Sequence, residues 1–208
     1  MSLNPAVRFV SVVAAVAGLS AAASAVITGT TGAPFQIAAP ASCIPFALPT
    51  GSQIFVWNEQ QGVNVTGLPV DLSINPSNSG SPTAGFVAGL VDSHFVHFDA
   101  LGQANGTVTF NSPIIGVAYS DTFLDVSDPV TGAFGTVYPT GTPGRGVFTL
   151  PFLNSFVDIN GNTLTLKLDT ISPVYDFDQI RVYTRTVPAP GSMALLGAGG
   201  LLASRRRR

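Results

Sequence analysis

The stretch FVAGLVDSHFVHFD, residues 86–99, decides the fold of this chain of 208 residues. It is rich in valine, phenylalanine and other residues that favour the pleated backbone of a β-strand. The clearest alternation lies at Thr163–Asp169, where threonines and other polar residues take turns with leucines. That period of two places the leucines on one face of a strand and the polar side chains on the other. Asn160-Gly161-Asn162 precedes it and predicts a hairpin turn from a strand over 155–159.

Shorter segments of similar composition predict further strands at 35–38, 54–59, 63–66, 70–74, 107–110, 114–119, 134–138, 147–150 and 177–183. Residues 75–83 and 121–144 are rich in turn-forming residues, and no window of the body shows helical spacing. About ten short strands separated by frequent turns predict an all-β fold, an antiparallel β-sandwich of jelly-roll type.

The last 22 residues differ from the body and consist of three parts. Val187-Pro188-Ala189-Pro190 interrupts any helix or strand, because proline lacks an amide hydrogen and restricts the residue before it. Residues 191–204 carry no charge and predict a short apolar helix suited to lipid. Arg205-Arg206-Arg207-Arg208 then forms a membrane stop that stays on the cytoplasmic side. Since roughly 20 residues are needed to cross a bilayer, we expect transient rather than permanent membrane anchoring.

This terminus resembles the PEP-CTERM sorting signal of bacterial envelope proteins. The match comprises the sorting motif Val187-Pro188-Ala189-Pro190, the apolar residues 191–197 and the arginines 205–208, with alanine where the family usually has glutamate. The resemblance implies cleavage near the prolines by an exosortase-like processing enzyme, in a Gram-negative bacterium that makes extracellular polysaccharide. The body is broadly similar to the β-sandwich ectodomains of such proteins at 93–99 and 177–182. A plain C-terminal membrane anchor is the alternative.

The N-terminus has the pattern of a secretory signal peptide. Arg8 precedes the apolar run 9–19, and small residues follow up to Ala23-Ser24-Ala25. A positive start, a short apolar region and small residues at Ala23 and Ala25 predict cleavage after Ala25 by signal peptidase. A buried N-terminal helix is the alternative. The chain is thereby divided into a signal peptide (1–25), an extended leader (26–51), a β-sandwich domain (52–186) and the sorting tail (187–208).

Without both signals, the body is acidic. Four basic residues against eleven acidic ones leave it a formal net charge of −7, whereas the whole chain carries −2. Nucleic acid requires basic patches, so no nucleic-acid partner is expected. Cys43 is the only cysteine, which excludes an internal disulfide and predicts a buried free thiol or intermolecular pairing.

Two histidines provide the first candidate for chemistry. In a strand, a spacing of three places His94 and His97 on opposite faces, so a shared metal is disfavoured. His97 and Asp99 share a face and could form a histidine–carboxylate pair. A catalytic triad of Ser93, His97 and a distant acid lacks the glycines of a nucleophile elbow, and a hydrogen-bonded histidine is the simpler interpretation.

Carboxylates provide the second candidate. Asp99, Asp158, Asp176 and Asp178, with Asp169 nearby in sequence, could hold a structural Ca²⁺, which takes oxygen ligands. Ordinary hydrogen bonding of these carboxylates is the alternative. The spacing of the aspartates at 121, 125 and 128 does not match a helix-loop calcium site and favours turn-forming roles.

The third candidate concerns glycans. Glycoside hydrolysis requires two carboxylates, whereas Glu59 is the only glutamate and no partner can be named for it. Trp57 could serve as a sugar platform, although a core position is the simpler interpretation. We therefore expect a non-enzymatic protein, exported across the inner membrane and transiently anchored there. It would end at the cell surface or in the extracellular matrix, associated with exopolysaccharide. The alternatives are a Ca²⁺-assisted carbohydrate-binding module and a matrix glycan hydrolase.

Overall fold

The computed structural model describes residues 24–48, 51–74, 82–147, 155–170 and 177–186. Two β-sheets make up most of this part, and all strand pairs but one are antiparallel. The prediction of an all-β sandwich is therefore confirmed at this level. The strands of the four-stranded sheet, in spatial order, are β1 (Ile27–Gly32), β6 (Gly102–Phe110), β9 (Thr163–Thr170) and β8 (Phe156–Asn160).

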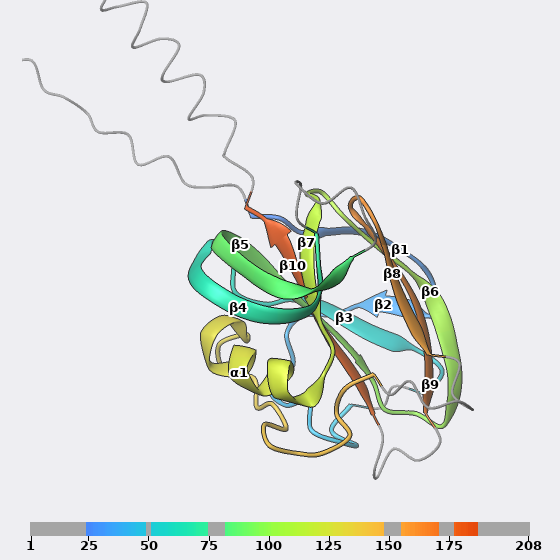
Figure 1. Ribbon diagram of the computed structural model, residues 1–208. Coiled ribbons are helices and arrows are strands. Elements are labelled where there is room, and N and C mark those ends of the chain that lie inside the picture. Colours follow the sequence, from blue (N-terminus) through green and yellow to red (C-terminus); the bar gives the residue numbers. More distant parts are fainter. Residues whose placement is uncertain (1–23, 49–50, 75–81, 148–154, 171–176, 187–208) are drawn as a thin grey trace, which may run out of the picture. The chain divides into compact units, whose positions relative to one another are not determined.

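The six-stranded sheet is organised around its longest strand. Its order is β10 (Asp178–Arg185), β7 (Ile114–Ala118), β4 (Val63–Ser73), β5 (Thr83–Phe98), β3 (Ile54–Asn58) and β2 (Pro34–Gln36). The first half of β5 pairs with β4, and its second half pairs with both β3 and β10. The stretch 86–99 thus contacts three other strands, which explains its continuous β-forming composition (Figure 1).

The six-stranded sheet is covered on both faces. One face packs against the four-stranded sheet, where Leu164, Leu166 and Leu168 of β9 meet Val96 and Ile180 in a common core. The opposite face carries a second cluster around Trp57, Phe95 and Leu124. A strand covered on both sides loses the alternation of buried and exposed residues, and residues 91–98 of β5 are buried without interruption.

Helix α1 (Asp121–Thr131) lies below the β4–β5 hairpin in Figure 1 and corrects the sequence prediction, which places only turns in this region. The residues of its buried face are Leu124, Ser127, Asp128 and Thr131. Only one of these four is apolar, so the 3.6-residue hydrophobic period that signals a helix is missing. Pro129 lies within its last turns and further disguises it.

The segment predicted as an extended leader, 26–51, takes part in both sheets. β1 pairs with β6 through five residue pairs, and β2 pairs with β3 in the one parallel pairing. The strand predicted at 134–138 does not form, because Val137 makes only an isolated bridge with Ser42. The two strands predicted at 63–66 and 70–74 are one strand, β4, whose register shifts between Val65 and Leu68.

Several predicted features lie outside the described residues. These are most of the signal peptide, including Ala23, the sorting motif Val187, Pro188, Ala189 and Pro190, the apolar span, and the stop Arg205, Arg206, Arg207 and Arg208. Within the described residues, no helix has the length and apolar character that crossing a membrane would require. The described strands and α1 fall within one compact unit, residues 22–187.

Candidate functional site

A network of buried charges lies between α1 and the six-stranded sheet. Arg181 points from β10 toward α1, on the side opposite Ile180 and Val182, which face the inter-sheet core. Its Nε and a terminal nitrogen donate to the two carboxylate oxygens of Glu59, at 2.7 and 2.9 Å. The other terminal nitrogen donates to Asp128 of α1 at 3.0 Å. The side chains of Arg181 and Glu59 are fully buried.

A second arginine extends the network. Arg145 lies in the loop after α1, is fully buried, and contacts Asp128 at 2.6 Å and the half-exposed Asp125 at 2.7 Å. Its Nε donates to the side-chain oxygen of Gln179 at 3.0 Å, which joins the network to β10. Asp128 therefore bridges two arginines, and the hydroxyl of Thr140 also donates to it at 2.5 Å. These contacts tie α1 and the loop that follows it to the sheet.

Aromatic rings enclose the guanidinium of Arg181. Its central carbon lies 4.8 Å from the ring centre of Phe95 and 5.0 Å from that of Tyr138, within the range of cation–π attraction. The hydroxyl groups of Tyr138 and Ser93 both donate to Glu59. Burial tends to lower the pKa of Arg181, but Glu59, Tyr183 and Asp128 together outweigh it and raise that pKa well above its ordinary value. Burial and the neighbouring Glu59 likewise raise the pKa of Tyr138.

This geometry does not suit catalysis at Glu59. Both of its oxygens are bound by Arg181, Ser93 or Tyr138, and its side chain has no exposed surface. A catalytic carboxylate must reach the substrate within hydrogen-bonding distance, so the glycan-hydrolase hypothesis loses its only named acid. Trp57 is also fully buried, in the cluster beneath α1, and cannot serve as a sugar platform.

The histidines face opposite sides of the sheet, as their spacing predicts. His97 lies 3.3 Å from Asp99 and 3.0 Å from the side-chain amide of Gln179. The predicted histidine–carboxylate contact is thus confirmed, and both side chains are buried. Ser93 donates to Glu59 instead of His97, so the triad considered from the sequence does not assemble.

His94 lies on the inter-sheet side of β5. Its ring is 4.6 Å from that of Phe110, and its two nitrogens contact Asn58 at 2.8 Å and Thr184 at 3.0 Å. The Oδ1 atom of Asn58 also accepts the backbone N–H of Ile27, which identifies it as an oxygen. Since this oxygen can only accept, Nδ1 of His94 carries the proton and donates to it. Burial lowers the pKa of His94 to about 3, which keeps the ring neutral at ordinary pH.

The predicted calcium ligands that the structure describes, Asp99, Asp158 and Asp178, do not form one group. Asp158 is exposed on β8 in the four-stranded sheet, whereas Asp178 is buried on β10 in the other sheet. Asp99 accepts the backbone N–H of Phe46 at 3.0 Å, and Asp176 lies outside the described residues. Within the described ranges, no three histidine, cysteine, aspartate or glutamate side chains form a group suited to a metal ion.

Asp92 joins the two ends of the folded body. One of its oxygens accepts the backbone N–H of Ala25 at 2.5 Å. The other accepts the N–H of Gly62 at 2.6 Å and the hydroxyl of Thr186 at 3.1 Å. Ala25, 67 positions before Asp92, and Thr186, 94 positions after it, therefore meet at this buried carboxylate.

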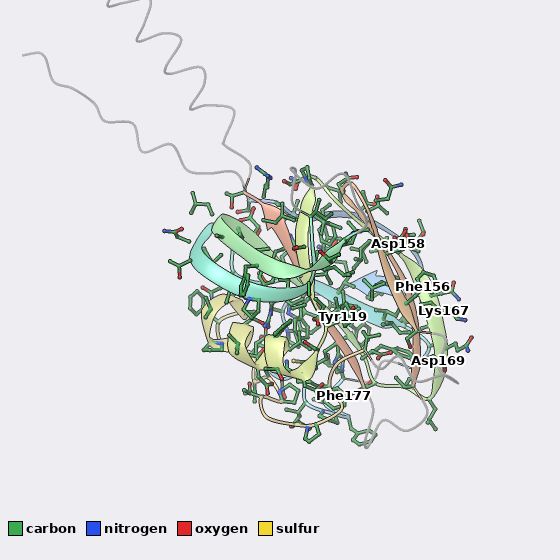
Figure 2. All side chains as sticks on the ribbon, viewed as in Figure 1. Tyr119, Phe156, Asp158, Lys167, Asp169 and Phe177 are labelled. Atoms are coloured by element: carbon green, nitrogen blue, oxygen red, sulfur yellow. The ribbon has the colours of Figure 1, made fainter. Side chains whose placement is uncertain are left out.

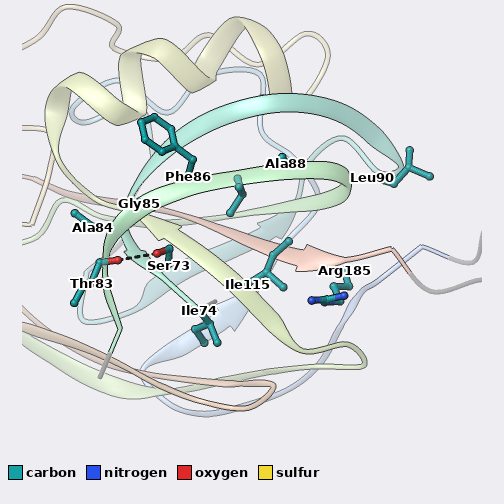
Figure 3. Close-up of a pocket in the computed structure, with 11 residues that line it drawn as sticks. Ser73, Ile74, Thr83, Ala84, Gly85, Phe86, Ala88, Leu90, Ile115 and Arg185 are labelled. Atoms are coloured by element: carbon teal, nitrogen blue, oxygen red, sulfur yellow. Dashed lines mark hydrogen bonds between the residues drawn. The ribbon is translucent and has the colours of Figure 1, made fainter. Parts of the chain in front are cut away.

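A hollow of about 680 Å³ lies beside the β4–β5 hairpin (Figure 3). The exposed apolar side chains Phe86 and Leu90 line it, together with Ile115 and Arg185, and Ser73 donates to the carbonyl of Thr83 at its edge. Arg185 is the only charged side chain among its described lining residues. An acid–base pair for hydrolysis is therefore not assembled from these residues.

Comparison with protein-family models gives no match, and neither the curated proteins nor the solved structures compared with this chain match it.

The sequence did not predict the charge network, although one feature of the sequence indicated it. The body contains only three arginines, Arg145, Arg181 and Arg185, and one of them lies between core residues of a predicted strand. An arginine in that position faces the side opposite its neighbours and requires a carboxylate there if that side is buried. The sequence did not indicate that Glu59, just after β3, lies opposite Arg181, nor that a helix places Asp128 there.

Proposed function

We propose that this chain is an exported, non-enzymatic protein of the cell surface or extracellular matrix, sorted through its C-terminal tail. In this proposal the signal peptide directs export, and the apolar span with its four arginines holds the chain briefly in the membrane. An exosortase-like enzyme then cuts near Pro188 and Pro190. We also infer that the sandwich is of jelly-roll type, because the chain crosses between sheets from β5 to β6 and from β9 to β10.

The observation that best supports this proposal is the position of Thr186, whose hydroxyl donates to the buried carboxylate of Asp92 just before the predicted sorting motif. The C-terminal end of the body is thus fixed by the body's own carboxylate, next to the predicted boundary of the sorting tail. At the other end, signal-peptide cleavage would remove Ala25 and its bond to Asp92, and the backbone nitrogen of Val26 lies 2.8 Å from the side-chain oxygen of Asn111. Processing on the C-terminal side of Thr186 would leave the hydrogen bonds of Asp92 to Gly62 and Thr186 in place. Such a body is suited to be cargo, because these described contacts at its C-terminal end do not involve the sorting tail.

The non-enzymatic character is part of the proposal and has a physical basis. The charged groups that could perform acid–base chemistry are used inside the fold, with Glu59 and Asp128 paired to arginines. His97 is buried beside Asp99 and Gln179. A protein whose task is to occupy a surface or matrix needs stability outside the cell rather than a reactive cleft.

Intact-mass spectrometry of the chain recovered from a host with an exosortase tests the proposal. We expect the mature product to start at Val26 and to lack Arg205–Arg208. Replacing Pro188 and Pro190 together by alanine should leave the C-terminus uncut, whereas Arg185→Gln, in the body, should be processed normally. Recovery of the unaltered chain with its arginines still attached would refute the proposal.

A further inference from the structure

The outer face of the four-stranded sheet carries an ordered array of hydroxyl groups. Because Leu164, Leu166 and Leu168 face the core, Thr163, Thr165 and Lys167 face outward from β9. On β6, Thr107 lies directly opposite Thr165 and Thr109 directly opposite Thr163. Four threonines on two adjacent strands thus form a square at the centre of the face.

Neighbouring strands extend this array. Thr31 of β1 lies opposite Thr107, and their hydroxyl groups are 2.8 Å apart. On the other side, Asp158 of β8 lies opposite Thr165. Threonine is restricted at its first side-chain torsion, so these hydroxyl groups lose little conformational freedom when they bind a partner. The row Thr31–Thr107–Thr165–Asp158 therefore presents polar atoms across the full width of the sheet.

An aromatic ring adjoins this row. Phe156 of β8 lies opposite Lys167, which in turn lies opposite Asn105 of β6. Figure 2 shows Phe156, Asp158, Lys167 and Asp169 along β8 and β9, at the outer side of the sheet. Phe156 is 47% exposed, although an apolar ring of this size is normally placed in a core. A hollow of about 330 Å³ lies here, with Phe156, Lys167, Asn105, Thr107 and Thr165 in its lining.

This combination matches the chemistry of a sugar ring. A pyranose has an apolar C–H face that can lie on an aromatic ring, and its rim of hydroxyl groups both donates and accepts hydrogen bonds. Threonine hydroxyls and the Asn105 amide offer the complementary donors and acceptors. A shallow site in which hydroxyl and amide groups border one exposed ring differs from the desolvated apolar core of a protein–protein interface.

The charges on this face favour a neutral glycan. Lys167 is the only lysine of the chain, and the exposed carboxylate of Asp158 lies on the same face, as does the largely buried Asp169. Asp169 also accepts a hydrogen bond from Gln103 at 2.7 Å. One cation between two anions gives the face no excess of positive charge with which to attract an acidic polysaccharide.

We propose that the outer face of β6, β9 and β8 binds neutral polysaccharide, with Phe156 as the stacking platform and Thr107, Thr165 and Asn105 as hydrogen-bonding groups. This inference rests on the proposed function, because it names the matrix component that the exported body would contact. It requires no metal ion and no part of the buried charge network.

Affinity electrophoresis of the full chain in mild detergent tests the proposal. Native gels are cast with hydroxyethyl cellulose, with dextran, with the neutral polysaccharide fraction of the host, or with the anionic carboxymethyl cellulose. We expect at least one neutral glycan to retard the chain. Phe156→Ala should weaken that retardation about tenfold, whereas Phe156→Trp should retain it. Replacing Thr107 and Thr165 by valine, which keeps the shape and removes the hydroxyls, should weaken it as well.

Two exposed phenylalanines elsewhere provide matched controls. Phe86 is 74% exposed beside the β4–β5 hairpin and Phe134 is 89% exposed after α1, so their alanine variants should bind like the unaltered chain. Circular dichroism and thermal unfolding verify that every variant folds. Retardation by no neutral glycan, or only by carboxymethyl cellulose, would overturn the proposal, as would equal losses in all three phenylalanine variants.

The binding test is separate from the sorting test. Phe156→Ala should be exported and cut like the unaltered chain, as read by mass spectrometry. Normal processing without glycan binding would reject the binding face and leave the proposed sorting intact. Glycan binding by a chain that is never cut would reject the sorting and leave the binding face intact.

Discussion

Arg181 and Glu59, 122 residues apart in sequence, form a two-bond ion pair whose side chains have no exposed surface. Removing two ions from water is costly, and the pair offsets this cost only because each partner has further hydrogen bonds. Arg181 also donates to Ser127 and Asp128, and Glu59 accepts from Ser93 and Tyr138. The bonds from Arg181 to Ser127 and Asp128 hold α1 against the sheet.

Breaking this pair on one side should strongly destabilise the fold. Arg181→Met leaves the Glu59 carboxylate buried without its cation, and we expect a loss of about 3–5 kcal/mol in the free energy of unfolding. Urea denaturation followed by tryptophan fluorescence measures this, since Trp57 lies in the same apolar cluster. Replacing both residues, with Glu59→Leu added, should cost less than the sum of the two single changes. Arg185→Met, at an exposed position, is the control, and an equal loss there would contradict the prediction.

His94 should make stability depend on pH. Its pKa is about 3 in the folded state, against roughly 6.5 for an unfolded histidine, so the unfolded chain binds the extra proton between these values. Stability from this residue is complete above about pH 6.5 and falls as the pH drops toward 3, by up to about 1.4 kcal/mol per pH unit. Urea titrations at pH 7.5, 6 and 5 measure the slope. His94→Gln should flatten it over this range, and an unchanged slope would count against the assignment.

Cys43 should be inert toward thiol reagents while the protein is folded. Burial raises the pKa of its thiol to about 12, and the thiolate is the reactive form. At pH 8 only roughly one molecule in ten thousand carries the thiolate, so labelling by iodoacetamide should require unfolding. Mass spectrometry of the chain with and without urea tests this. Rapid labelling of the folded chain would show that the thiol is accessible.

Gly106 should tolerate no side chain, because β1 approaches it closely. A Cβ there would overlap the carbonyl oxygen of Thr31 and the ring of Pro34. We expect Gly106→Ala to lower the free energy of unfolding by about 1–3 kcal/mol, the usual cost of overpacking. Gly29 of β1 has open space around the corresponding position, so Gly29→Ala is the matched control. Thermal unfolding compares the two, and equal midpoints would contradict this account.

Local patterns predicted the strands well where one face meets the core. The alternation at 163–169 gave both the strand and its buried leucines, and the hairpin at Asn160-Gly161-Asn162 joins β8 to β9 as expected. The burial of Trp57 and Cys43 also agrees with the simpler interpretations made from the sequence. These features depend on a few neighbouring residues, which is why a single sequence contains them.

Features that depend on distant partners were predicted poorly. Helix α1 was not recognised because its inward face consists mainly of polar residues, whose partners are Arg181 and Arg145 on other elements. The contribution of 27–36 to both sheets was not evident, since short strands rich in glycine and threonine gain their stability from β6 and β3. The candidate glycan face likewise requires three strands in register.

The sequence by itself determined the β class, the inward leucines of β9 and the acidic, charge-poor character of the body. These properties follow from composition and from the alternation of side chains along a single strand. Only the tertiary structure decided that Glu59, Asp128, Arg145 and Arg181 would meet, and that Phe156 would lie beside two rows of threonines. These contacts depend on strand register and on connections that bring residues tens of positions apart together. The local alternation of side chains carries no information about either.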